Sequence, residues 1–277
     1  MESNVRKVQN VQLQILKDFM FFCKEHQLRY FMSGGSLIGV MRHKGFIPWD
    51  DDIDVVMPRK DYNKFVKLQD EYPNDYFIVN HDADKNWQFN FSQFVDGQSE
   101  IIVHMNEKPR KCKIWIDVFP LDGLPNNALL RWFHIKRIMM YRYLIQIPNI
   151  RTQVDTHKVG RPFYEKCVIK LFHYIPLGRL VKVDSVLKKM QEYLEKYDYD
   201  GSNFVGNMLG KYREREVVPH DYFGQGKVMD FEDIKVYCPY EPDLLLKHLY
   251  GEYMQLPPEK DRVSHDIEIV KLRQQKL

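Results

Sequence analysis

The sequence predicts an α/β (α+β) protein with a mixed sheet, flanking helices and a mainly helical C-terminal half. Two patterns carry this prediction: strand-like and helix-like apolar spacings alternate over residues 4–119, and helical spacing prevails beyond Gly123. The composition agrees, because 277 residues with 44% apolar and 29% charged side chains are typical of a globular protein that buries a core. This balance excludes disordered, collagenous and coiled-coil chains.

The first half opens with an amphipathic helix predicted over residues 4–26. A short strand at 30–32 leads into the glycine turn Gly34-Gly35-Ser36, and Ser36 is expected to cap a helix over 37–41. The other elements expected in this half are a strand at 50–57 that Pro58 closes, a helix at 61–71, and strands at 77–80, 87–95 and 113–119.

The second half changes character after the turn at 121–125. This change places a boundary between an N-terminal core, residues 1–125, and a mainly helical part, residues 126–277. No long polar linker separates the two parts, so we expect them to pack together as one unit. The elements expected here are helices at 128–146, 163–175, 180–197 and 242–250, with a single strand at 235–238.

Charge and cysteine content narrow the class of protein. The net charge is only +3 and no nucleic-acid-binding motif is present, so we expect no nucleic-acid partner. The four cysteines lie far apart and lack a neighbouring histidine, which indicates reduced thiols and not a zinc site. The N-terminus does not resemble a signal peptide and no stretch is long enough to span a membrane, so a cytoplasmic location is expected.

The densest polar motif is Asp50-Asp51-Asp52-Ile53-Asp54. Alternate residues of a strand face the same side, so Asp52 and Asp54 are expected to point together while Ile53 enters the core. Carboxylates held this close repel one another unless a cation lies between them, and their hard oxygens suit Mg²⁺ or Mn²⁺ better than zinc. The alternative is an acidic turn that is solvated before the strand.

A third carboxylate, Asp117, stands within the apolar strand at 113–119. An ionised, unpaired side chain at such a position would cost several kcal/mol of desolvation, so Asp117 needs a partner. A cation shared with Asp52 and Asp54 would supply one. The alternatives are a buried salt bridge and a cap near the strand end.

The glycine turn offers a second kind of site. Backbone N–H groups at a helix N-terminus suit a phosphate, although a Gly-Gly pair also forms plain turns and this spacing matches neither a Walker A nor a dinucleotide motif. The position of Gly34, Gly35 and Ser36 shortly before the aspartates favours a nucleotide. Arg42 and Lys44 lie between the two motifs, where they would either hold a phosphate or stabilise the C-terminal end of the helix.

The order strand, Gly-Gly-Ser, helix, Asp-x-Asp strand and later Asp strand resembles the polymerase-beta-type nucleotidyltransferase fold. Within it, Gly-Ser-Leu-Ile-Gly at 35–39 and Met-Arg-His-Lys-Gly-Phe-Ile-Pro-Trp-Asp-Asp-Asp-Ile-Asp at 41–54 are similar to the LicD family, to which fukutin-related proteins are also similar. The similarity continues through 116–123, 250–254 and 256–258, with Arg262 and His265. Departures at His220 and at Phe-Glu-Asp 231–233, where Phe-Glu-Gly is usual, affect the acceptor side.

The resemblance implies a LicD-type phosphotransferase with a nucleotidyltransferase-like catalytic core at 1–125. Such an enzyme would move phosphocholine, or a related alcohol phosphate, from a CDP-activated donor to a sugar hydroxyl of a lipopolysaccharide, teichoic acid or capsule precursor, releasing CMP. It places a catalytic Mg²⁺ or Mn²⁺ on Asp52, Asp54 and Asp117, the last of which is also a candidate base. The donor phosphates would then lie near the glycine turn, with Arg42 and Lys44 beside them.

Two other functions remain open at the level of sequence. A nucleotidyltransferase that attaches NMP to a small acceptor would use the same carboxylates and glycine turn, but it would release pyrophosphate instead of CMP. A non-catalytic, membrane-associated scaffold would retain only the fold. The segment 129–147 mixes aromatic and basic residues, so it is either a peripheral membrane contact near a lipid-linked acceptor or a core helix with snorkelling basic side chains.

Overall fold

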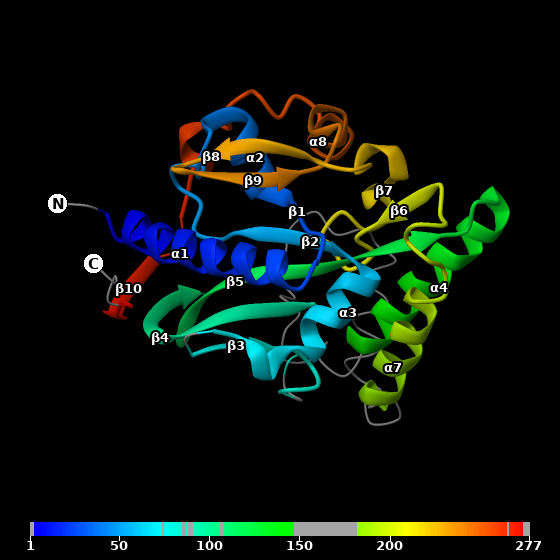
Figure 1. Cartoon of the computed structure of the whole chain (residues 1–277), viewed down its shortest axis with the longest axis horizontal. Helices are drawn as coiled ribbons and strands as arrows, with labels where there is room; N and C mark the ends of the chain where they lie inside the picture. The colour runs from blue at the N-terminus through cyan, green and yellow to red at the C-terminus, as the bar shows by residue number, and fades with distance from the viewer. Residues whose placement is uncertain are drawn as a thin grey trace.

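The computed structural model describes residues 3–73, 75–84, 87, 91–105, 108–146, 182–264 and 266–273 (Figure 1). An eight-stranded mixed sheet forms its centre, and its main path runs β1-β2-β5-β4-β10. Outside this path, β3 pairs with β4, and β6 pairs with both β5 and β7. The strands of this sheet are β1 (Phe31–Met32), β2 (Asp54–Pro58), β3 (Tyr76–Val79), β4 (Ser92–Met105), β5 (Lys108–Leu124), β6 (Phe204–Gly206), β7 (Val217–Pro219) and β10 (Asp266–Lys271). The mixed α/β class predicted from the sequence is confirmed.

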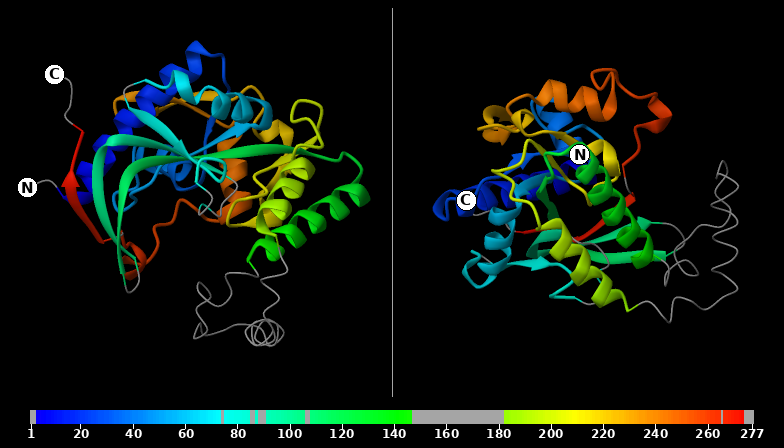
Figure 2. Two further views of the ribbon diagram at one scale, coloured as in Figure 1. Left: turned by 90° about the horizontal axis from the view of Figure 1, so that it is seen from below. Right: turned by 90° about the vertical axis from the view of Figure 1, so that its right-hand side faces the viewer.

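Within the central sheet, β2 and β5 are parallel and every other pairing is antiparallel. The long strands β4 and β5 curve together (Figure 2). A separate antiparallel hairpin, β8 (Lys227–Phe231) and β9 (Ile234–Cys238), packs against β1.

Helices cover the sheet and the hairpin. They are α1 (Asn4–Glu25), α2 (Gly34–His43), α3 (Arg59–Lys67), α4 (Ala128–Gln146), α7 (Val183–Leu194) and α8 (Pro242–Tyr250), with short 3-10 turns η1 (Gln69–Glu71), η4 (Arg213–Glu216), η5 (His220–Tyr222) and η6 (Glu259–Asp261). Helix α1 lies against β5 because its apolar stripe, centred on Ile15, Leu16 and Phe19, is fully buried. Helices α4 and α7 pack side by side at the far end of the molecule (Figure 1).

Two hydrophobic clusters hold these layers together. The larger draws on both sequence halves, since it joins α1 and the central strands to Val205, Val218, Val236 and Leu246. The smaller lies between α4 and α7 and includes Ile138 and Met190. No helix among the described residues is long and apolar enough to cross a membrane. Cys23, Cys112 and Cys238 are free thiols, as expected, whereas Cys167 lies outside the described residues.

Several predicted elements differ in the structure. The helix expected at 37–41 begins at Gly34 with Ser33 as its N-cap, so the predicted capping role of Ser36 is wrong. The strand expected from residue 50 begins only at Asp54. Strands β6, β7, β8 and β10 were not predicted. Strands β6 and β7 have only three residues each, and β6 and β10 pair with the distant strands β5 and β4, whereas β8 pairs with the neighbouring β9. The helix expected at 163–175 lies outside the described residues.

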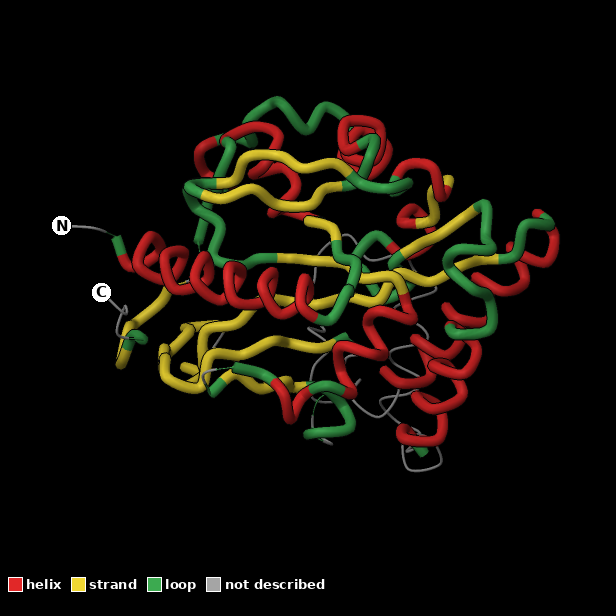
Figure 3. The backbone as a smooth tube through the Cα atoms, viewed as in Figure 1, coloured by secondary structure: helices red, strands yellow, loops and turns green. Residues whose placement is uncertain are grey.

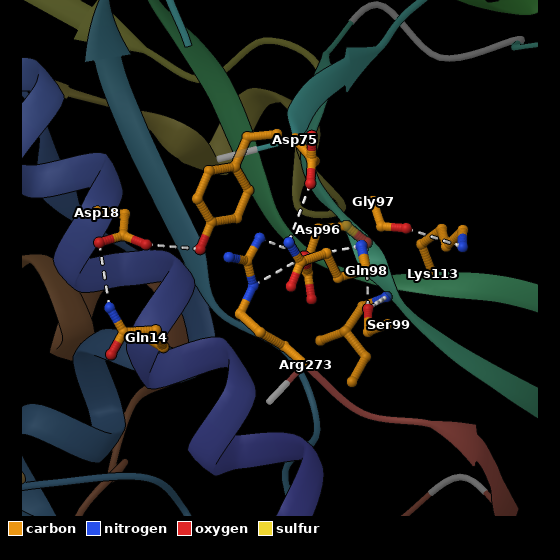
Figure 4. A network of polar contacts seen from close by, with 11 residues as sticks. Gln14, Asp18, Asp75, Asp96, Gly97, Gln98, Ser99, Lys113 and Arg273 are labelled. Atoms are coloured by element: carbon orange, nitrogen blue, oxygen red, sulfur yellow. Dashed lines mark hydrogen bonds and ion pairs between the residues drawn. The ribbon is translucent and has the colours of Figure 1, made fainter. Parts of the chain in front are cut away.

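A buried ion pair fixes the C-terminal segment to the sheet (Figure 4). Asp96 is fully buried at a bulge of β4, and its Oδ1 accepts hydrogen bonds from Arg273 Nε at 3.0 Å and Nη2 at 2.6 Å. The guanidinium of Arg273 also lies 4.5 Å above the ring of Tyr76, whose hydroxyl donates to Asp18 of α1 at 2.7 Å. The last strand, β10, therefore lies beside α1, the first helix, and Asn4 Nδ2 donates to the carbonyl of Ile267 at 3.0 Å.

Candidate functional site

Two of the predicted carboxylates meet at the parallel pair in the middle of the sheet. Asp54 at the start of β2 lies directly opposite Asp117 of β5, and the N–H of Asp117 donates to the carbonyl of Ile53 at 2.8 Å. Register partners on adjacent strands present their side chains on the same face of a sheet. The pairing thus brings together two acidic residues that lie far apart in the sequence.

The acidic loop before β2 is held by two buried glutamines of α1. Gln9 Nε2 donates to the carbonyls of Asp50 at 2.8 Å and Ile47 at 3.2 Å, and Gln12 Nε2 donates to the carbonyl of Asp51 at 2.7 Å. Both glutamines are 2% exposed. Because these carbonyls bond to side chains, residues 50–52 run as a loop beside the sheet instead of as the predicted strand. Asp52 therefore joins the site from this loop.

The glycine turn packs directly onto the carboxylates. A β-carbon on Gly35 would lie 2.7 Å from Oδ2 of Asp50, and one on Gly34 would overlap Oδ2 of Asp54. Gly34 also has a φ of +55°, a conformation that favours glycine. The hydroxyl of Ser36 accepts the N–H of Asp54 at 2.9 Å, so this serine joins α2 to β2. The close approach explains why α2 begins with two consecutive glycines.

Burial and mutual repulsion raise the pKa values of these carboxyl groups. Burial, and then the charges of Asp52 and Asp51, raise the pKa of Asp50 to about 8. Burial raises the pKa of Asp117 to about 7, although its Oδ1 accepts a 2.9 Å hydrogen bond from Gln93 Nε2. Burial, followed by Asp52 and Asp117, raises the pKa of Asp54 well above its usual range. Ionising these carboxyl groups together is therefore unfavourable, because each charged form raises the pKa of its neighbours.

The chemistry of this cluster fits a hard divalent cation. Its donors are carboxylate oxygens, which Mg²⁺ and Mn²⁺ prefer, and a cation would relieve their repulsion. In the part of the chain that the structure describes, no three His, Cys, Asp or Glu side chains are already arranged to hold a metal ion. Binding would therefore require the carboxylates of Asp52, Asp54 and Asp117 to converge further.

The two predicted phosphate-binding cations lie at the end of α2 in different surroundings. Arg42 is half-buried, and its pKa is lowered by burial and by Arg262 while the Asp50 carboxylate opposes this shift. Lys44 is exposed, ends the helix in a left-handed conformation with a φ of +54°, and accepts the N–H of Glu232 at its carbonyl at 2.8 Å. Its charge acts on the β8–β9 hairpin, where Lys235 and then Lys44 lower the pKa of Asp230. The charge of Asp50 therefore reaches Arg42.

Two residues near the acidic cluster were missed by the sequence analysis. Gln93 lies opposite Asp117 on β4, which only the strand register reveals. Glu216 ends η4, and burial raises its pKa to about 7 against the effects of the Tyr212 N–H and of Arg142. Its charge also contributes to the raised pKa of Asp54, after the contributions of the aspartates. The alternating run Arg-Glu-Arg-Glu that contains Glu216 reads as a solvated turn and gave no signal.

Of the two histidines at which the sequence was compared with the LicD family, the structure describes His220. His220 packs its ring edge-to-face on Tyr199 at 4.7 Å, and its Nε2 has no hydrogen-bond partner among the described residues. His265 lies outside the described residues.

Comparison with known proteins gives three relevant matches. Residues 27–149 match the family described as LicD/FKTN/FKRP, nucleotidyltransferase domain. Over 271 residues, 95% of this chain and 96% of the relative, the sequence is 29% identical to the lipopolysaccharide cholinephosphotransferase LicD of Haemophilus influenzae. It is also 25% identical over 144 residues, 50% of this chain and 44% of the relative, to an uncharacterized protein of Rickettsia typhi.

Proposed function

Because this chain is a member of the LicD family, with its nucleotidyltransferase domain at residues 27–149, we propose that it is a phosphotransferase of the LicD type. It moves phosphocholine, or a related alcohol phosphate, from a CDP-activated donor to a sugar hydroxyl of a cell-surface glycan precursor. The observation that carries this proposal is the similarity along nearly the whole chain to a lipopolysaccharide cholinephosphotransferase. The paired Asp54 and Asp117 beside the glycine turn support it.

In the proposed reaction, the acceptor hydroxyl forms a new bond to the distal phosphorus of the donor, and the bond from that phosphorus to the CMP oxygen breaks. Asp52, Asp54 and Asp117 would hold Mg²⁺ or Mn²⁺, which when bound stabilises charge on the phosphate oxygens. The proton of the acceptor hydroxyl passes to a carboxylate, for which Asp117, oriented by Gln93, is the candidate. Gly34 and Gly35 lie so close to Asp54 and Asp50 that a side chain at either glycine would meet a carboxylate. The absence of side chains there would leave space for a phosphate of the donor.

We further propose that the protein works in the cytoplasm at the surface of a membrane, close to a lipid-linked acceptor. The first turns of α4 support this, since Leu129, Leu130, Trp132 and Phe133 are 52–65% exposed. The same helix buries Ile138, Met139 and Ile145 in the smaller core, so its later turns agree with the alternative of a core helix. Exposed aromatic and aliphatic side chains next to Lys136 and Arg137 are typical of an interfacial helix.

Product analysis with the purified full chain tests the proposed reaction. The protein is incubated with Mg²⁺, a glycan acceptor and CDP-choline, CDP-ethanolamine, CDP-glycerol or CDP-ribitol, and in parallel with UTP or ATP. We expect release of CMP with one CDP-alcohol, loss of this release in Asp52→Asn, and no loss in Asp70→Asn, which removes an exposed carboxylate of η1. Release of pyrophosphate from a nucleoside triphosphate would instead identify a nucleotidyltransferase, the activity after which the matched domain is named. No turnover with any donor would indicate a scaffold.

A further inference from the structure

A basic cluster lies next to the acidic site, and it consists of Arg42, His43 and Arg262 around the ring of Trp49. Arg42 Nε donates to His43 Nε2 at 2.9 Å, and the ring of His43 lies edge-to-face with that of Trp49 at 6.3 Å. The guanidinium of Arg262 lies 5.5 Å from the centre of the Trp49 ring. Trp49 directly precedes Asp50, so this cluster adjoins the acidic loop.

The cluster joins two distant parts of the chain. Arg42 Nη1 donates to the carbonyls of Tyr253 at 2.9 Å and Gln255 at 3.4 Å, in the long loop that follows α8. The same loop carries Arg262, whose Nε donates to the carbonyl of Pro257 at 2.8 Å. Figure 3 shows this loop running from α8 past α2 to η6. The loop that carries Arg262 is therefore held on α2 through Arg42, and Arg262 itself lies against Trp49.

These arginines keep donors free for a ligand. In the described ranges neither guanidinium forms an ion pair with a carboxylate, and Nη1 and Nη2 of Arg262 have no hydrogen-bond partner. Arg262 also acts on Arg42 as a like charge, since it lowers the pKa of Arg42 after the larger effect of burial. Two neighbouring guanidiniums without a carboxylate are stabilised by an anion, and their planar forks match phosphate oxygens.

We infer that Arg42 and Arg262, aligned by the ring of Trp49, form a phosphate-binding subsite beside the acidic cluster. Its assignment to the diphosphate of the nucleotide donor rests on the proposed function. A phosphate carried by the acceptor has the same chemistry and is the other source. The aspartates and the arginines would then contact the same phosphates, the former through a cation and the latter directly.

Arg262 offers the sharper test, because Arg42 also holds the loop through Tyr253 and its replacement risks unfolding. Binding of inorganic diphosphate, CDP and cytidine to the full chain is measured by calorimetry for the wild type, Arg262→Gln and Arg262→Lys. Lys260→Gln is the matched control, since it removes an exposed positive charge from the same loop. Thermal unfolding of each variant establishes that the fold is retained.

We expect Arg262→Gln to weaken binding of diphosphate and CDP about ten- to hundredfold, the worth of charge-assisted hydrogen bonds, and to leave cytidine binding unchanged. The affinity of Arg262→Lys for diphosphate and CDP should lie between those of the wild type and Arg262→Gln, because lysine keeps the charge but not the planar fork. If CDP binding is unchanged while KM rises for a phosphorylated glycan and not for its dephosphorylated form, the subsite holds the acceptor phosphate.

Equal behaviour of Arg262→Gln and Lys260→Gln in all these measurements would overturn the inference. Failure of the proposed function looks different: diphosphate binding would still depend on Arg262, but no CMP would be released from any CDP-alcohol.

Discussion

Asp54 and Asp117 are direct register partners on the parallel strands β2 and β5, and both are buried carboxyl groups with raised pKa values. A sheet gains no stability from two acids placed side by side, since like charges directly opposite are destabilising. Such a pair is typical of a functional site, where a bound cation would compensate the repulsion. The parallel pairing of β2 with β5 is therefore the feature of the fold on which the proposed chemistry depends.

Neutralising one member of this pair should separate stability from activity. Asp54→Asn is expected to raise the melting temperature measured without divalent cations, because it relieves repulsion, and to abolish the additional stabilisation by Mg²⁺. Transfer activity should fall roughly a thousandfold or more, since metal-type stabilisation is worth several kcal/mol. Thermal unfolding with and without Mg²⁺ checks this, with Asp70→Asn as control. An undiminished Mg²⁺ response in Asp54→Asn would contradict the assignment.

The contact between Gly35 and Asp50 makes a steric prediction. Gly35→Ala places a β-carbon 2.7 Å from Oδ2 of Asp50, so the carboxylate must move. We expect donor affinity and transfer rate to fall at least tenfold while the protein stays folded. Gly201→Ala is the matched control, because nothing lies within 4 Å of the added carbon. Equal donor affinity of the two variants, measured by calorimetry, would show that the close approach has no functional role.

The buried pair of Arg273 and Asp96 should dominate the stability of the C-terminal segment. Arg273→Met is expected to lower the free energy of unfolding by about 3–5 kcal/mol, because it leaves the Asp96 carboxylate buried without its cation. Lys271→Met, an exposed neighbour on β10, should change it little. Adding Asp96→Asn to Arg273→Met should restore part of the loss. Urea unfolding measures all three; a cost below 1 kcal/mol for Arg273→Met would refute the prediction.

A buried histidine should make stability depend on acid pH. Burial, and then Lys196, lower the pKa of His134 to about 4 from an unfolded value of 6.5. Below pH 6.5 the unfolded chain binds a proton at His134 that the folded protein does not. The free energy of unfolding is therefore fully retained above pH 6.5 and falls as the pH is lowered from 6.5 to 4. Partial solvent screening keeps the loss to about 2 kcal/mol.

His134→Phe provides the comparison for this pH dependence. The phenyl ring preserves the stacking on Tyr193, where the rings are 4.4 Å apart, but cannot take up a proton. Urea unfolding at pH 7 and pH 5 should give a smaller difference for this variant than for the wild type. Identical pH dependence of the two proteins would show that His134 is not responsible.

The exposed residues of α4 predict membrane attachment. Trp132→Ser combined with Phe133→Ser should reduce sedimentation with anionic lipid vesicles about tenfold or more, because it removes large apolar side chains that would enter the interface. Transfer to a soluble glycan fragment should be unchanged, since neither side chain belongs to the acidic or basic cluster. Phe77→Ser, another exposed aromatic residue, is the control. Vesicle binding equal to that of the wild type would exclude this surface.

The sequence by itself determined the features that depend on neighbours within a few residues. Helical periodicity located α1 to within one residue of its C-terminal end, and the alternation of apolar residues located the strand that carries Asp117. The glycine turn and the aspartate motif were recognised by spacing alone, and the structure brings them into contact. Such patterns are local because backbone geometry and side-chain direction repeat over two to four residues.

Only the tertiary structure decided which distant segments meet. The register of β2 with β5 places Asp54 opposite Asp117, and the pairing of β4 with β5 adds Gln93. Gln9 and Gln12 hold the acidic loop out of the strand that its alternation predicts, and the loop after α8 brings Arg262 to Trp49. These relationships rest on burial and hydrogen bonding between segments that no local pattern connects, and they decide which polar side chains become neighbours.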